Sequence, residues 1–67
     1  MEIDIRKSII NNFNNSDINE IKESIESSIK DNEEITLPGL GVFFELLWKN
    51  SNKEMKDKIL NNIQKGL

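Results

Sequence analysis

Apolar residues recur at helical spacing in three stretches of the chain, with polar residues filling the positions between them. In each stretch a spacing of three or four places the apolar side chains on one face of an α-helix. The three faces consist of Ile5, Ile9 and Phe13; of Ile18, Ile21, Ile25 and Ile29; and of Met55, Ile59 and Ile63. The pattern therefore predicts three amphipathic helices, one near each end of the chain and one following the first.

Polar residues at the start of each predicted helix suit the role of N-cap. Asp4 is the expected N-cap of the first helix, with Ile3 before it as a hydrophobic staple, and Ser16 is expected to cap the second. Ser51 and Glu54 have the S-x-x-E spacing of a capping box, which predicts that the last helix begins at Ser51.

The segment from Leu37 to Trp48 is far more apolar than the rest of the chain and contains its single proline. Residues 33–37 are expected to be extended, because a proline disfavours helical geometry in the residue before it. Pro38 and Gly39 are expected to form a turn, in which proline sets φ and glycine supplies a positive φ. The turn would direct the chain inward just before the apolar run begins.

The apolar run itself fits either a strand or a helix. In a strand, alternation would bury four side chains, those of Val42, Phe44, Leu46 and Trp48. Phe43 and Leu47 would then remain in water. In a helix, Glu45 and Lys49 form one polar stripe facing solvent, and the other side chains form a broad apolar surface. We favour the helix, because it leaves fewer large side chains in water.

Together these elements predict an all-α protein, a compact bundle of four short helices around a central apolar helix. Residues 1–67 are expected to form a single small domain, because this length is near the lower limit for independent folding. Trp48 is expected in its core. The alternative is an α+β fold: two helices, a β-hairpin over residues 34–37 and 42–46, and a C-terminal helix.

Composition narrows the chemistry that the chain can perform. It has no cysteine and no histidine, which removes disulfides, thiolate metal sites and the commonest general base. We expect no enzyme, no bound cofactor and no metal, because no nucleophile–base pair, ligand set or cofactor motif is recognisable. Gly39 and Gly41 lack the further residues of a phosphate-binding loop. Without a long apolar run or a secretory signal, we expect a protein that spans no membrane and stays inside the cell.

The net charge of −3 is unevenly distributed, with −5 on residues 1–34 and +2 on residues 35–67. This asymmetry would suit head-to-tail pairing of two copies, although two solvated helix faces of different charge are the simpler interpretation. The basic last helix raises nucleic-acid binding as an alternative function, with contacts from Lys53, Lys56, Lys58 and Lys65. The absence of interleaved aromatic residues and arginines in that helix makes this alternative the weaker one.

Nine residues of the apolar segment resemble a family signature. They are Leu37, Pro38, Gly39, Leu40, Gly41, Val42, Phe44, Glu45 and Trp48. This block resembles the signature of small acid-soluble spore proteins of the I type, minor proteins of endospore-forming Firmicutes, and the likeness extends over nearly the whole chain. The resemblance implies expression in the developing forespore and residence in the spore core. It brings no catalytic residues.

The resemblance brings no settled molecular role either. Together with a Phe/Leu/Trp segment that is large for so short a chain, it leads us to expect a non-enzymatic spore component that binds a protein partner or a second copy of itself. The motifs of the α/β-type spore proteins, which coat DNA, are absent from this sequence. A weaker likeness links the run "NEEITLPGLGVFFE" and the two helices before it to the N-terminal half of the HU family of bacterial histone-like proteins. That likeness underlies the α+β alternative, but the basic DNA-gripping arm of HU has no counterpart here.

Overall fold

Four α-helices and one short 3-10 helix make up the computed structural model, which describes residues 4–67. The helices are α1 (Ile5–Phe13), α2 (Ile18–Asp31), α3 (Leu37–Lys49) and α4 (Lys53–Lys65), and the 3-10 helix η1 (Glu34–Thr36) runs directly into α3. Over these described residues the structure contains no strand. The all-α prediction is therefore confirmed, and the α+β alternative is wrong.

Side-chain caps begin three of the helices. The carboxylate of Asp4 accepts a hydrogen bond from the amide of Lys7 at 3.0 Å, as expected. Ile3, expected as a hydrophobic staple, lies outside the described residues. The second helix is capped by Asp17 rather than Ser16, and the Asp17 carboxylate accepts from the amide of Glu20 at 2.9 Å.

The N-cap of α4 is Asn52, whose side chain accepts from the amide of Met55 at 2.8 Å, and not Ser51 as the capping-box spacing predicted. The hydroxyl of Ser51 instead donates to the carbonyl of Leu47, in the last turn of α3. Ser51 therefore satisfies the C-terminal end of one helix, and the next residue caps the other.

The expected turn at Pro38 and Gly39 is wrong, because both residues lie in the first turn of α3. Proline is well tolerated there, since its missing N–H has no helical partner to lose. Leu37 has α-helical dihedral angles (φ −59°, ψ −41°) despite preceding a proline. Residues 34–36 form η1 instead of an extended segment, so a continuous helical path overrides the preference for extended geometry before proline.

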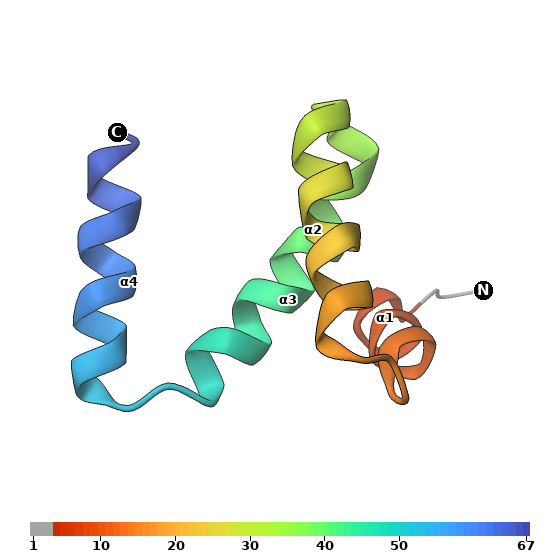
Figure 1. Cartoon of the computed structure of the whole chain (residues 1–67), viewed down its shortest axis with the longest axis horizontal. Coiled ribbons are helices and arrows are strands. Elements are labelled where there is room, and N and C mark those ends of the chain that lie inside the picture. Colours follow the sequence, from red (N-terminus) through yellow and green to blue (C-terminus); the bar gives the residue numbers. More distant parts are fainter. Residues whose placement is uncertain (1–3) are drawn as a thin grey trace.

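The hydrophobic core is small and lies where α1 and α2 meet α3. Val42 of α3, 5% exposed, is the one residue between positions 4 and 67 that is buried. The rings of Phe13 and Phe43 meet edge to face, with centroids 5.1 Å apart and planes at 75°, a favourable arrangement for two aromatic rings. These contacts join α1 to α3, while α2 and η1 cover the N-terminal part of α3 (Figure 1).

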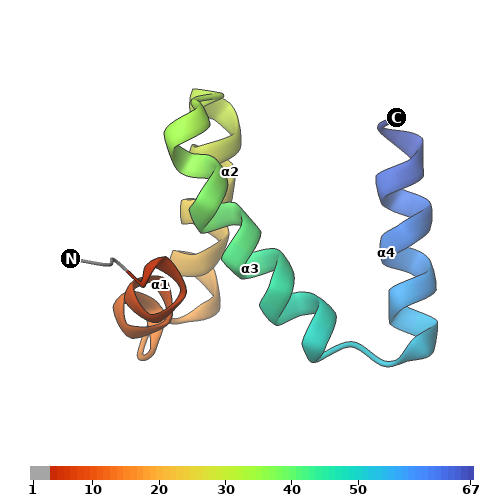
Figure 2. The same ribbon diagram turned by 180° about the vertical axis from the view of Figure 1, so that it is seen from behind.

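The position of α4 differs from the compact bundle predicted. A sharp bend at residues 50–52 leads into α4, which stands apart from α1 and α2 in both views (Figures 1 and 2). The radius of gyration is 13.1 Å, whereas a compact domain of this length averages about 11 Å. Two of the three amphipathic helices therefore pack on α3, and the third meets it only near its C-terminal end.

Candidate functional site

The nine signature residues all lie on α3, but they face different surroundings. Val42 is buried, four residues are half-buried and four are exposed. The half-buried ones are Gly39, Leu40, Glu45 and Trp48, and the exposed ones are Leu37, Pro38, Gly41 and Phe44. The segment was expected to be covered by its neighbours, whereas the structure covers one side of it and leaves much of the rest in contact with water.

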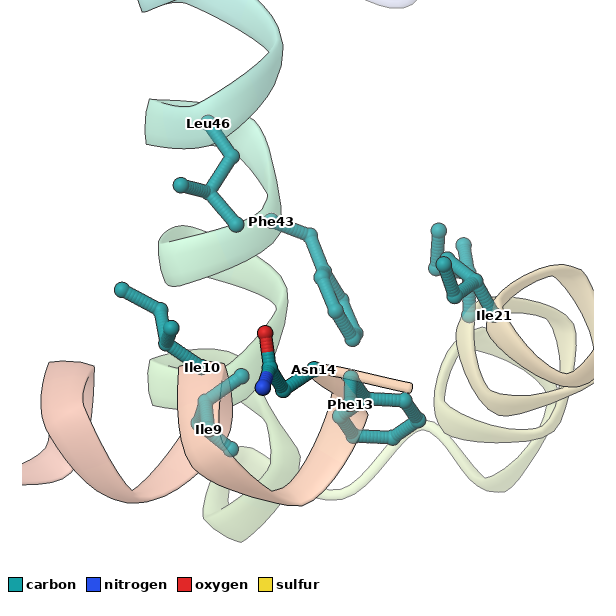
Figure 3. A pocket seen from close by; sticks show the side chains of 8 residues that line it. Ile9, Ile10, Phe13, Asn14, Ile21, Phe43 and Leu46 are labelled. Atoms are coloured by element: carbon teal, nitrogen blue, oxygen red, sulfur yellow. The ribbon is translucent and has the colours of Figure 1, made fainter. Parts of the chain in front are cut away.

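One side of α3 contributes to an open apolar groove between the first three helices (Figure 3). The groove encloses about 370 Å³ and is lined by Ile9, Ile10, Phe13, Asn14, Ile21, Ile25, Phe43 and Leu46. Seven of these eight side chains are hydrocarbon, so the groove favours an apolar occupant. Its residues come from three separate helices, so no single segment of the sequence could predict the groove.

A second side of α3 carries Glu45, which binds Arg6 of α1. The Nε of Arg6 donates to one carboxylate oxygen at 2.6 Å and the terminal nitrogen Nη2 donates to the other at 2.7 Å. This paired geometry makes the contact directional as well as attractive. Glu45 and Lys49 lie near each other on α3, as expected, and the structure adds a contact that the sequence did not predict: Glu45 ties α3 to α1.

The hydrogen bonds from Arg6 and its positive charge hold the pKa of Glu45 below the usual glutamate value, against a smaller opposing effect of burial. The same hydrogen bond and charge raise the pKa of Arg6. Sequence analysis missed this pair because the two residues are 39 positions apart. The available signal was that the chain has a single arginine, placed on a predicted helix of its own.

The third side of α3 carries an aromatic pair that meets α4. The rings of Phe44 and Trp48 stack with centroids 6.0 Å apart and planes at 26°. The ammonium of Lys56, on α4, lies 5.1 Å from the centre of the Trp48 ring, within the range of a cation–π contact. Leu60 joins both rings around a second, more open hollow of about 280 Å³. Trp48 is half-buried here, at a helix junction and not in a core.

The four lysines of α4 do not form one basic face. Lys56 is engaged in the cation–π contact with Trp48. Lys58 and Lys65 are seven residues apart and therefore share a side of the helix, while Lys53 projects from a different side. Glu54 and Asp57 lie between them in the sequence. Phosphate binding depends on several cationic side chains acting together. The four lysines of α4 are instead distributed over different sides of the helix.

The chemistry of α3 and its neighbours is that of an apolar contact surface. Phe44, Leu46 and Leu47 are 36–45% exposed, and the two hollows beside them are lined mainly by hydrocarbon. Among residues 4–67 no cluster of three or more acidic side chains is placed to hold a metal ion. In the same range no helix is long and apolar enough to cross a bilayer.

Comparison with known proteins gives consistent matches over the whole chain. The family model of small, acid-soluble spore protein I matches residues 3–67. A small, acid-soluble spore protein I of Halalkalibacterium halodurans is 40% identical over 67 residues, which is 100% of this chain and 98% of the relative. Proteins of the same name from Geobacillus kaustophilus and Bacillus mycoides are each 34% identical over 100% of this chain and 97% of theirs. No solved structure matches.

Proposed function

The chain belongs to the small, acid-soluble spore protein I family, and on this premise we propose that it is a non-enzymatic component of the spore core that acts through protein contacts. Membership identifies it as a sporulation protein associated with the spore. The proposal adds the compartment, the spore core, and the mode of action. The nine signature residues are proposed to serve structure and interaction, with no catalytic role.

The observation that carries the proposal is the exposed apolar surface of α3. Phe44 is 42% exposed and Leu47 is 45% exposed, and both sit on the most apolar helix of the chain. Large side chains left open on a helix are characteristic of surfaces that bind another protein. Glu45 pairs with Arg6 of α1, whereas Phe44 and Leu47 on other sides of α3 remain exposed.

Photo-crosslinking inside spores tests this proposal. A photoreactive amino acid would replace Leu47, on the exposed apolar surface, and in a matched control would replace the exposed polar residue Asn19. We expect protein adducts in irradiated spores from the Leu47 position and few from the Asn19 position. Equal yields at both positions, or no protein adduct at Leu47, would contradict the proposed mode of action.

A fluorescent fusion tests the compartment. We expect signal in the forespore during sporulation and in the core of the mature spore. Signal confined to the mother cell or to the outer spore layers would contradict the proposed location.

Nucleic-acid binding through α4 is the competing hypothesis, favoured by the net charge of +2 on that helix. A mobility-shift titration with duplex DNA at about 50 mM salt is the most permissive test, because electrostatic binding is strongest at low salt. We expect no retention of the DNA. Retention that is lost in the double variant Lys58→Glu/Lys65→Glu would establish the competing function.

A further inference from the structure

The isoleucine stripe of α2, formed by Ile18, Ile21, Ile25 and Ile29, is exposed at its two ends and half-buried at its centre. Ile18 is 83% exposed and Ile29 is 63% exposed, while Ile21 and Ile25 line the open groove of Figure 3. The residues of α2 that face the rest of the chain include two serines. Ser24 and Ser28 border a hollow beside Gly39, and the Ser28 carbonyl lies 3.4 Å from the hydroxyl of Thr36. The helix thus turns two serines toward the rest of the chain and leaves two of its four isoleucines exposed.

The apolar face of α4 is open as well. Met55, Leu60 and Ile63 are 43–52% exposed, and the helix meets its own chain mainly through Lys56 and Trp48. An α-helix of 13 residues is about 20 Å long and one of 14 residues about 21 Å, so α4 and α2 have matching lengths. The molecule therefore carries two uncovered apolar faces of similar extent.

The accessible surface area of this chain is larger than that of an average folded monomer of the same mass. A folded monomer of 7.8 kDa exposes about 4,400 Å² on average, whereas this chain exposes 6,055 Å². The excess is about 1,700 Å², and a stable interface covers about 800 Å² on each partner. The excess surface is therefore large enough for a stable interface with a partner of this chain's own size.

Charge decides which faces meet. Helix α2 carries four acidic and two basic residues, a net charge of −2, and α4 carries two acidic and four basic residues, a net charge of +2. Two α2 helices would repel each other, and so would two α4 helices. An α4 from one copy against an α2 from another brings opposite charges together around two apolar faces.

We propose that the partner is a second copy of this chain, with α4 of each copy lying along the isoleucine stripe of α2 in the other. This inference deepens the proposed function, on which it rests, by naming the partner and the surface. The exchange is reciprocal, so both α2 stripes and both α4 faces are covered in a closed two-fold dimer. The interface covers Ile18 and Ile29, which the isolated chain leaves in water, and closes the open groove that Ile21 and Ile25 line.

A charge-swap experiment tests the proposed pairing. Lys58→Glu/Lys65→Glu changes the net charge of α4 from +2 to −2, and Glu23→Lys/Glu26→Lys changes that of α2 from −2 to +2. All four residues are exposed, so the variants are expected to keep their helices. Each variant alone gives the two facing helices net charges of the same sign, while a mixture of the two restores opposite net charges for both helix pairs.

Sedimentation equilibrium at about 5–100 µM protein and about 50 mM salt reads out the result. We expect the unmodified chain at twice the mass of 7.8 kDa, each variant alone as a monomer, and the equimolar mixture again at twice that mass. Lys7→Glu, an exposed change on α1, is the matched control and should remain dimeric. Circular dichroism confirms that every variant stays helical.

A second variant removes the apolar part of the contact without touching the core. Ile18→Asn/Ile29→Asn alters only the exposed ends of the stripe, and we expect it to weaken dimerisation at least tenfold. An unmodified chain that is monomeric at the highest concentration, or a mixture that does not dimerise, would overturn the proposal. If adducts to other proteins still form at Leu47 in spores, the proposed function stands although the dimer does not; absence of any adduct removes the function itself.

Discussion

The two ends of α3 are held by their neighbours in different ways. Its N-terminal and central residues meet α1: Gly39 lies beside Ile9, Val42 is buried, Phe43 forms an edge-to-face pair with Phe13, and Glu45 forms a bidentate ion pair with Arg6. Its C-terminal end meets α4 mainly through Lys56 over Trp48, with Leu60 nearby. Several kinds of contact fix the position of α1 on α3, whereas α4 is held to α3 mainly by the contact between Lys56 and Trp48. Local stability depends on the number of such contacts, so α4 is held less firmly than α1.

The largest expected loss of stability comes from a substitution in the part of α3 that packs on α1. Phe43→Ala removes one ring of the pair that joins α1 to α3, and we expect a loss of about 2–3 kcal/mol, because Phe43 is half-buried and a fully buried phenylalanine loses about 3–5. Domains of this size have only about 3–10 kcal/mol of stability in total. Chemical denaturation followed by circular dichroism measures the loss. Phe43→Leu, which keeps much of the hydrocarbon but loses the ring, is the control and should cost less; a leucine variant as stable as the unmodified chain would mean that the ring pair is unimportant.

At the weakly held end, Trp48→Ala should uncouple α4 without unfolding α1–α3. We expect a loss of about 1–2 kcal/mol, from the removed stacking and cation–π contacts. Hydrogen exchange should show faster exchange in α4 and unchanged protection around Val42. Global unfolding on this substitution would show that Trp48 belongs to a core, as the sequence pattern suggested, and would remove the contrast between the two ends.

Gly41→Ala separates the observed helix from the turn and hairpin considered at the outset. Gly41 lies inside α3, has no positive φ, and a Cβ added there meets no atom within 4 Å. Alanine in a helix interior is favoured over glycine, so we expect about 0.5–1 kcal/mol of added stability. A rise in the denaturation midpoint measures it. Destabilisation would contradict a helix at this position.

The smallest effect concerns the ion pair, and it depends on pH. The pKa of Glu45 is lowered in the folded state, so its stabilising contribution is complete above the ordinary glutamate pKa of about 4.3 and is lost as the pH falls through the lower folded value. We therefore expect the unmodified chain to be more stable than Glu45→Gln near pH 7, with the difference shrinking towards pH 3. Denaturation of both proteins across this range measures it, and a difference independent of pH would contradict the Arg6 pairing.

The sequence predicted the helices better than the contacts between them. The periods of four in α1, α2 and α4 depend only on neighbours in the chain, and all three helices are present near the predicted positions. Their caps shifted by one residue at Asp17 and Asn52, because adjacent polar residues compete for the same role. The predicted turn at Pro38 and Gly39 was wrong because proline and glycine have two local uses, and the pattern alone does not separate them.

What the sequence by itself determined is the all-α class, the amphipathic character of three helices, the apolar character of α3 and, through the signature block, the family. Only the tertiary structure decided that Glu45 faces Arg6, that Ser24 and Ser28 of α2 face the rest of the chain, and that α4 stands apart from α1 and α2. The reason is physical. Helical periodicity specifies which residues share a face, because it arises from bonds between near neighbours, but which face meets which is settled by a competition among distant contacts.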